Sequence, residues 1–153
     1  MDKKQHYESF LPQLQALIDP QQDLTSILAN CAAAIHEEFG FLWTGFYLVR
    51  PDGQLHLGPF QGPVACYTIP FGRGVCGTAW QQRQTLVVGD VETFPGHIAC
   101  SSRSRSEIVV PLFDQQGEVW GVLDIDSEHV GTFDETDRQY LEQAVKGIRR
   151  SEE

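Results

Sequence analysis

The amino-acid sequence predicts an α+β fold, with a central antiparallel sheet of about six strands and the N- and C-terminal helices packed on one face. Apolar residues recur at helical spacing near both ends of the chain, in residues 3–18, 23–39 and 134–148. Short β-branched and aromatic runs separated by turns fill the middle. The chain has 153 residues and no Pro/Ser-rich linker, so we expect a single domain over residues 1–153.

The predicted helices have recognisable ends. In residues 23–39, Asp23 can accept hydrogen bonds from the first free N–H groups, and Gly40 can end the helix in a left-handed conformation. The apolar stripe of this helix includes Cys31. The last helix starts at Asp134, and an acidic residue three positions later approximates a capping box.

The middle of the chain alternates strand and turn signals. The strand candidates are residues 42–50, 54–60, 65–70, 85–90, 107–113 and 118–126. Residues 71–82 begin with glycines and continue as a short helix. Residues 91–106 have no apolar periodicity, so we expect a long loop there, and loops of this length inside compact domains are often functional.

Charge and hydropathy exclude several classes of function. The chain carries 21 acidic and 11 basic side chains, for a net charge of −10, and no run of basic residues. Nucleic acid and anionic membranes are therefore disfavoured as partners. The N-terminus lacks an apolar signal sequence and no apolar run is long enough to cross a membrane, so we expect a cytoplasmic protein. Structural disulfides are unusual in that compartment.

The four cysteines differ in their surroundings. Cys31 lies on a buried helical stripe, where a cysteine usually acts as a small apolar residue. Cys66 lies in a short predicted strand and can face the core or a cleft. Cys76 lies at the start of a short helix, where the helix dipole favours a thiolate. Cys100 lies in the long loop near His97 and two arginines, a setting typical of a reactive thiol.

Acidic residues continue one apolar strand face. Alternation places Asp124 and Asp126 on the same side of the last strand, after Trp120 and Val122. This pattern favours a polar pocket, although a strand that simply leaves the sheet for a polar loop has the same pattern. Glu107 opens the adjoining strand directly after the loop with the reactive cysteine, so its carboxyl can lie near the same pocket.

Two cofactor motifs are weak. Residues 72–77 match the glycine pattern of dinucleotide-binding loops, but the following helix is short and the acid that should contact the ribose comes too early. A zinc site built from Cys66, Cys76, His97 and Cys100 is disfavoured, because only the last two are close in sequence. The sequence therefore predicts neither a metal nor an organic cofactor.

Three segments are similar to one known family. Residues 58–80 (GPFQGPVACYTIPFGRGVCGTAW), 96–112 (GHIACSSRSRSEIVVPL) and 121–127 (GVLDIDS) closely resemble the free methionine-(R)-sulfoxide reductases, which are GAF-domain enzymes. The segment WTGFYL at residues 43–48 also fits. The resemblance covers residues 7–150 and implies a GAF-like fold and an oxidoreductase that reduces free L-methionine-(R)-sulfoxide under oxidative stress.

The resemblance implies a role for each of three cysteines. Cys100 would be the nucleophile that becomes a sulfenic acid, Cys66 the main resolving cysteine and Cys76 a secondary partner. A thioredoxin-like dithiol would then reduce the resulting disulfide. Arg103 and Arg105 are not part of the family pattern, so the resemblance gives them no role.

The resemblance also implies a substrate pocket. Glu107, Asp124 and Asp126 would hold the substrate's amino group and help to protonate the sulfoxide oxygen. Trp43 and Tyr47 would line the methyl-sulfoxide end. The preference for the R epimer comes from the resemblance alone.

The alternative hypothesis is a GAF domain that binds a small molecule without chemistry. Such sensors usually adjoin an output domain and have no use for three cysteines around one pocket, so the reductase is favoured. The sequence leaves the oligomeric state open, a homodimer included.

Overall fold

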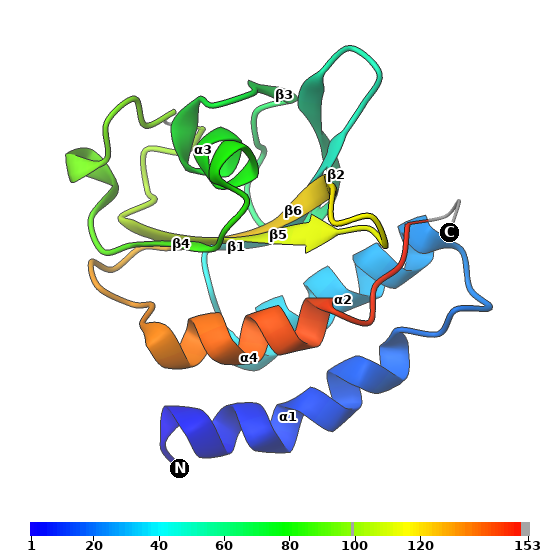
Figure 1. The fold of residues 1–153 in the computed structure, drawn as a ribbon. Coiled ribbons are helices and arrows are strands. Elements are labelled where there is room, and N and C mark those ends of the chain that lie inside the picture. The colour runs from blue at the N-terminus through cyan, green and yellow to red at the C-terminus, as the bar shows by residue number, and fades with distance from the viewer. Residues whose placement is uncertain (99, 151–153) are drawn as a thin grey trace.

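The computed structural model describes residues 1–98 and 100–150 and confirms the α+β fold (Figure 1). The helices are α1 (Lys3–Leu17), α2 (Leu24–Phe39), α3 (Gly74–Gln82) and α4 (Glu135–Val145), with a short 3-10 helix, η1, at Val91–Thr93. The strands are β1 (Trp43–Val49), β2 (Gln54–Gln61), β3 (Thr68–Pro70), β4 (Leu86–Val88), β5 (Ser106–Phe113) and β6 (Val119–Ser127). None of the helices in these described ranges is long and apolar enough to cross a membrane.

A six-stranded sheet forms the centre of the fold. Its strand order is β3-β2-β1-β6-β5-β4, and every neighbouring pair is antiparallel. The helices α2 and α4 cover one face and α1 packs against both of them, whereas α3 lies on the other face (Figure 1). The predicted packing of the N- and C-terminal helices on one face is therefore confirmed.

The predicted helix ends are also confirmed. The Asp23 side chain accepts a hydrogen bond from the N–H of Thr25, and Gly40 ends α2 with a φ of +67°. Asp134 and Asp137 form the capping box of α4. These local contacts satisfy N–H groups that have no partner inside the helix, which is why the sequence locates the helix starts well.

Alternation along the strands builds two separate cores. One core, called the helix-side core below, lies between the sheet and the helices α1, α2 and α4. The other lies between the sheet and α3. On β6, Leu123 and Ile125 belong to the first core and Val122 to the second. Cys31 lies in the helix-side core and is 1% exposed, as the apolar stripe predicts.

Cys31→Ala should lower the free energy of unfolding by about 1 kcal/mol, the usual size for a small buried truncation. The side chain is a buried free thiol that packs in the helix-side core, away from the α3 side of the sheet. Urea unfolding of the two proteins measures the difference. A loss above about 3 kcal/mol would contradict a purely apolar role.

Two sequence predictions about strands are wrong. The strand predicted over residues 65–70 contains only β3, so Cys66 precedes the strand instead of lying in it. The chain leaves the sheet edge at Tyr67, whose carbonyl accepts the last edge hydrogen bond from Leu57. Trp120 belongs to the helix-side core, not to the face of Asp124, because a register shift makes it the extra residue of a β-bulge.

Candidate active site

A pocket opens on the face of the sheet that carries α3. Its walls come from β1, β5, β6, the first turn of α3 and the loop before β5. The pocket brings together most of the residues that the sequence singles out: Trp43, Tyr47, Cys76, Cys100, Glu107, Asp124 and Asp126. The eighth, Cys66, is joined to one of them by a disulfide.

Sheet register explains why the three carboxylates meet. Glu107 on β5 lies directly opposite Asp126 on β6, and Asp124 lies two residues further along the same face. Directly opposed side chains on one sheet face lie within about 5.5 Å of each other at Cβ. The alternative, in which β6 simply leaves the sheet for a polar loop, is wrong for Asp124, since Asp124 and Glu107 are each only 6% exposed.

The carboxylates lack a balancing charge. Among the described residues, no lysine or arginine forms an ion pair with Glu107, Asp124 or Asp126. Burial raises the pKa of all three, and their mutual repulsion raises the pKa of Glu107 and Asp126 further. The Oδ1 atom of Asp124 is buried without a hydrogen-bond partner among the described residues. The pocket is therefore suited to a ligand with a cationic group. Without such a ligand, the raised pKa values favour the protonated form of these acids.

Glu107→Gln should stabilise the folded protein at neutral pH. Because burial raises the folded-state pKa of Glu107, the folded protein retains a proton that the unfolded chain releases above a pH of about 4.3. The free energy of unfolding therefore falls as the pH rises above about 4.3. The glutamine amide of Glu107→Gln does not titrate, so the variant avoids this loss. We expect a gain of about 1 kcal/mol at pH 7 that shrinks towards pH 4.

Urea unfolding at several pH values measures this gain, with Glu8→Gln on the exposed side of α1 as the matched control. An equal response of both variants would show that burial of Glu107 has no effect on stability.

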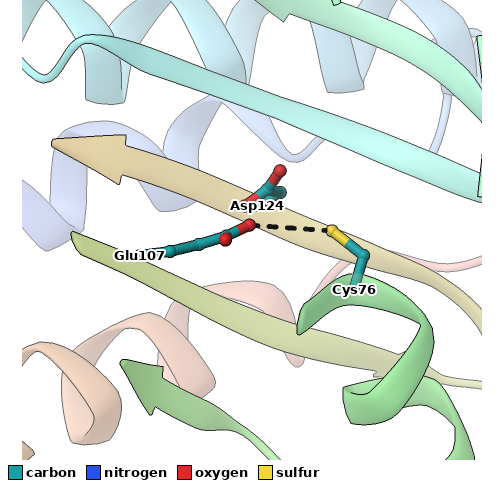
Figure 2. Close-up of side chains that lie close together, drawn as sticks. All are labelled: Cys76, Glu107 and Asp124. Carbon is teal, nitrogen blue, oxygen red and sulfur yellow. Dashed lines mark hydrogen bonds between the residues drawn. The ribbon is translucent and has the colours of Figure 1, made fainter. Parts of the chain in front are cut away.

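Cys76 lies next to these acids. It is in the first turn of α3 and 3% exposed, with its Sγ 4.0 Å from Oε2 of Glu107 (Figure 2). Burial raises the pKa of the Cys76 thiol well above its ordinary value, and Asp124 and Glu107 raise it further. The lowered pKa expected from the helix N-terminus is therefore wrong, because desolvation and negative neighbours outweigh the helix dipole.

Cys66 and Cys100 form a disulfide at the pocket. Their Cα atoms are 5.4 Å apart and 34 residues separate them in sequence. Both residues are half-buried, whereas the free thiols Cys31 and Cys76 are buried. The two cysteines that join are therefore the more exposed pair of residues among the four.

Hydrogen bonds fix the end of the Cys100 loop to the sheet. Ser104, which the sequence analysis missed, donates from Oγ to Oδ1 of Asp126 at 3.1 Å. The N–H of Arg105 donates to the carbonyl of Ser127 at 2.7 Å. Nothing in the sequence marks Ser104, because its importance depends on the register that sets it beside Asp126.

The charged residues of this loop separate into two groups. Arg103 and Arg105 are half-exposed and pair with Glu128 and Glu92, and neither lines the pocket. Their expected influence on the Cys100 thiol is therefore not supported. His97 does line the pocket, with Nε2 4.0 Å from Oε1 of Glu107. Burial lowers the pKa of His97, which favours its neutral form.

Two aromatic residues of β1, the strand next to β6, also line the pocket. Trp43 and Tyr47 stack with ring centroids 5.9 Å apart. The indole N–H of Trp43 donates to the Pro63 carbonyl at 3.0 Å, and the Tyr47 hydroxyl donates to the Cys66 carbonyl at 2.9 Å. The aromatic wall therefore also positions the segment that contains Cys66.

Gly45 makes room for this wall and was not identified from the sequence. A Cβ atom at Gly45 would lie 2.3 Å from Cβ of Phe60 and 2.6 Å from Cη2 of Trp43. Gly45→Ala should therefore displace the indole and lower the free energy of unfolding by about 1–3 kcal/mol. Urea unfolding and tryptophan fluorescence measure these effects. Gly89→Ala is the matched control, because its added Cβ meets no atom within 4 Å; equal losses would exclude a steric cause.

Comparison with known proteins identifies the class. The model of the GAF domain family matches residues 21–149. The chain therefore belongs to the GAF domain family.

Individual relatives narrow this assignment. The chain is 56% identical to GAF domain-containing protein A of Dictyostelium discoideum, over 94% of this chain and 90% of that protein. It is 43% identical to a free methionine-R-sulfoxide reductase of Escherichia coli (strain K12), over 98% and 90%. The solved structure of free methionine-R-sulfoxide reductase from Neisseria meningitidis with its substrate superposes with a TM-score of 0.93 at 54% identity, over 97% of this chain and 89% of that chain. The resemblance to the free methionine-(R)-sulfoxide reductases is confirmed.

Proposed function

We propose that this protein reduces free L-methionine-(R)-sulfoxide to L-methionine, with Cys100 as the nucleophile. The main support is that a half-buried cysteine pair and three carboxylates without a positively charged partner among the described residues lie at one pocket. The names of the relatives from Escherichia coli and Neisseria meningitidis support the same reaction.

The thiol chemistry needs a proton donor. In the reduced protein, the Cys100 thiolate attacks the electrophilic sulfoxide sulfur, while a carboxylic acid protonates the departing oxygen. The protonated oxygen then moves from the substrate sulfur to the Cys100 sulfur while the bond between the two sulfurs breaks, which releases methionine and leaves Cys100 as a sulfenic acid. A carboxyl with a raised pKa, such as Glu107 or Asp126, can hold the required proton near neutral pH.

The second half of the cycle returns the cysteines to thiols. The Cys66 thiol condenses with the sulfenic acid, which releases water and forms the disulfide between Cys66 and Cys100. An external dithiol, such as a cytoplasmic thioredoxin-like protein, then reduces that disulfide by exchange. Cys76 remains as a secondary partner, and its raised pKa makes it the poorer attacking thiol.

The acids would recognise the substrate through its α-ammonium group. A cation between Glu107, Asp124 and Asp126 would supply the missing charge and give the free Oδ1 of Asp124 a donor. The stacked rings of Trp43 and Tyr47 would contact the methyl-sulfoxide end. No step in this scheme requires a metal or an organic cofactor.

Incubation of the pure protein with dithiothreitol and methionine sulfoxide tests the proposal directly. We expect methionine to accumulate over many turnovers, from the R epimer and not from the S epimer. Binding of methionine sulfoxide without formation of methionine would favour the alternative, a GAF domain that acts as a sensor.

A further inference from the structure

The pocket also contains a set of metal-ligating atoms from three different elements. The Sγ of Cys76 on α3 and one carboxylate oxygen each from Glu107 on β5 and Asp124 on β6 lie within 4.8 Å of one another. Figure 2 shows Cys76 and Glu107 pointing toward each other, with the Asp124 carboxyl next to that of Glu107. All three are buried, and Nε2 of His97 lies 4.0 Å from the second oxygen of Glu107.

A second observation shows that this cluster lacks a partner. The Oδ1 atom of Asp124 is buried and accepts no hydrogen bond from any described residue. Asp124 is 6% exposed, so water does not solvate its carboxylate freely. A buried acceptor of this kind is satisfied by a bound cation or donor.

The ligand types favour zinc. Thiolate, imidazole and carboxylate are the groups that bind Zn²⁺, at about 2.0–2.3 Å in a tetrahedral arrangement. Ligand atoms of such a site are separated by roughly 3.3–3.8 Å, as follows from these bond lengths. The observed 4.0 Å between Cys76 and Glu107 therefore requires only a small inward movement of the side chains.

We propose that Zn²⁺ binds in this pocket through Cys76, Glu107 and Asp124, with a water molecule in the fourth position. On binding, the Cys76 thiol and the protonated Glu107 carboxyl release their protons to solvent, and no group changes oxidation state. The ion occupies the place of the substrate's ammonium group, so zinc acts as a reversible inhibitor and not as a cofactor. The inhibition rests on the proposed function, whereas the metal site itself does not.

Sequence spacing could not reveal this site. Zinc sites are recognised in sequences by ligands a few residues apart, but here Cys76, Glu107 and Asp124 come from distant segments. The zinc site weighed from the sequence combined Cys66, Cys76, His97 and Cys100, but Cys66 and Cys100 are joined to each other in the structure.

Cobalt is the probe for the test, because Co²⁺ bound tetrahedrally to a thiolate has intense visible bands and a near-ultraviolet charge-transfer band. The untagged protein is titrated with Co²⁺ while the disulfide between Cys66 and Cys100 is intact, so that only Cys31 and Cys76 are free thiols. We expect about one Co²⁺ per chain, with both signatures, and its displacement by Zn²⁺.

Three variants locate the ion. Cys76→Ser should remove the charge-transfer band, whereas Cys31→Ala should leave the spectrum unchanged. Asp124→Asn, checked for folding by circular dichroism, should weaken Co²⁺ binding at least about tenfold. A charge-transfer band that persists in Cys76→Ser, or an octahedral spectrum without this band in the unmodified protein, would overturn the proposal.

A final measurement separates this proposal from the proposed function. Free methionine sulfoxide should displace Co²⁺ from the unmodified protein, whereas its N-acetyl derivative should not. Cobalt binding through Cys76 without displacement would support the metal site and contradict the position assigned to the substrate's ammonium group.

Discussion

Cys100→Ser should abolish methionine formation even in a single turnover. The hydroxyl that replaces the thiol is a far weaker nucleophile, and Cys76 cannot substitute easily because burial and neighbouring acids raise the pKa of its thiol. The measurement is methionine released per chain after the pre-reduced protein is mixed with methionine-(R)-sulfoxide. The expected loss is complete within detection.

Cys66→Ser is the informative partner of that variant. It should release about one methionine per chain and then stop, because the sulfenic acid on Cys100 has lost its main resolving thiol. Trapping with dimedone and mass spectrometry would locate the sulfenic acid. Cys31→Ala, in the helix-side core, should keep full turnover and serves as the control. Normal turnover in Cys100→Ser would show that the nucleophile is another cysteine, with Cys76 the first candidate.

A blocked amino group should remove most of the activity. The three carboxylates have no positive partner among the described residues, and charge-assisted hydrogen bonds to an ammonium are stronger than neutral ones. An N-acetylated or peptide-bound methionine offers only a neutral amide and leaves buried acids unpaired, at a cost of about 3 kcal/mol. We expect kcat/KM to fall roughly 100-fold or more with N-acetyl-L-methionine-(R)-sulfoxide.

The variant Asp124→Asn tests the same contact from the protein side. It should lower kcat/KM for the free amino acid by roughly 100-fold while changing the rate for the N-acetyl substrate much less. Asp126→Asn should also lower kcat/KM for the free amino acid. Comparable rates on free and acetylated substrate would exclude the ammonium pocket, even if Cys100 proved to be the nucleophile.

The elements of the fold could be predicted because their signals are local. Asp23 and Asp134 cap helices through contacts within a few residues, and alternation on β6 places Asp124 and Asp126 on one face. The sequence predicts only that Glu107, at the start of the adjoining strand, can lie near this pocket, and the register of β5 and β6 places it opposite Asp126.

The features that sequence reasoning missed depend on tertiary contacts. The β-bulge at Trp120 breaks the alternation that otherwise predicts each face. The dipole of α3 suggested a reactive Cys76, but the burial that decides its pKa comes from strands distant in sequence. Gly45 and Ser104 matter only because Trp43 and Asp126 lie beside them in the folded chain.

The two-sided character of β6 limits how this protein can change during evolution. Leu123 and Ile125 fill the core beneath the helices, while Asp124 and Asp126 face the pocket from the same strand. Deletion of a single residue here would exchange the two faces, placing acids in the apolar core and aliphatic side chains in the pocket. A point substitution in this strand therefore alters either the core or the pocket, but not both. Insertions and deletions alter both, so they should be confined to the turns at the ends of the strand.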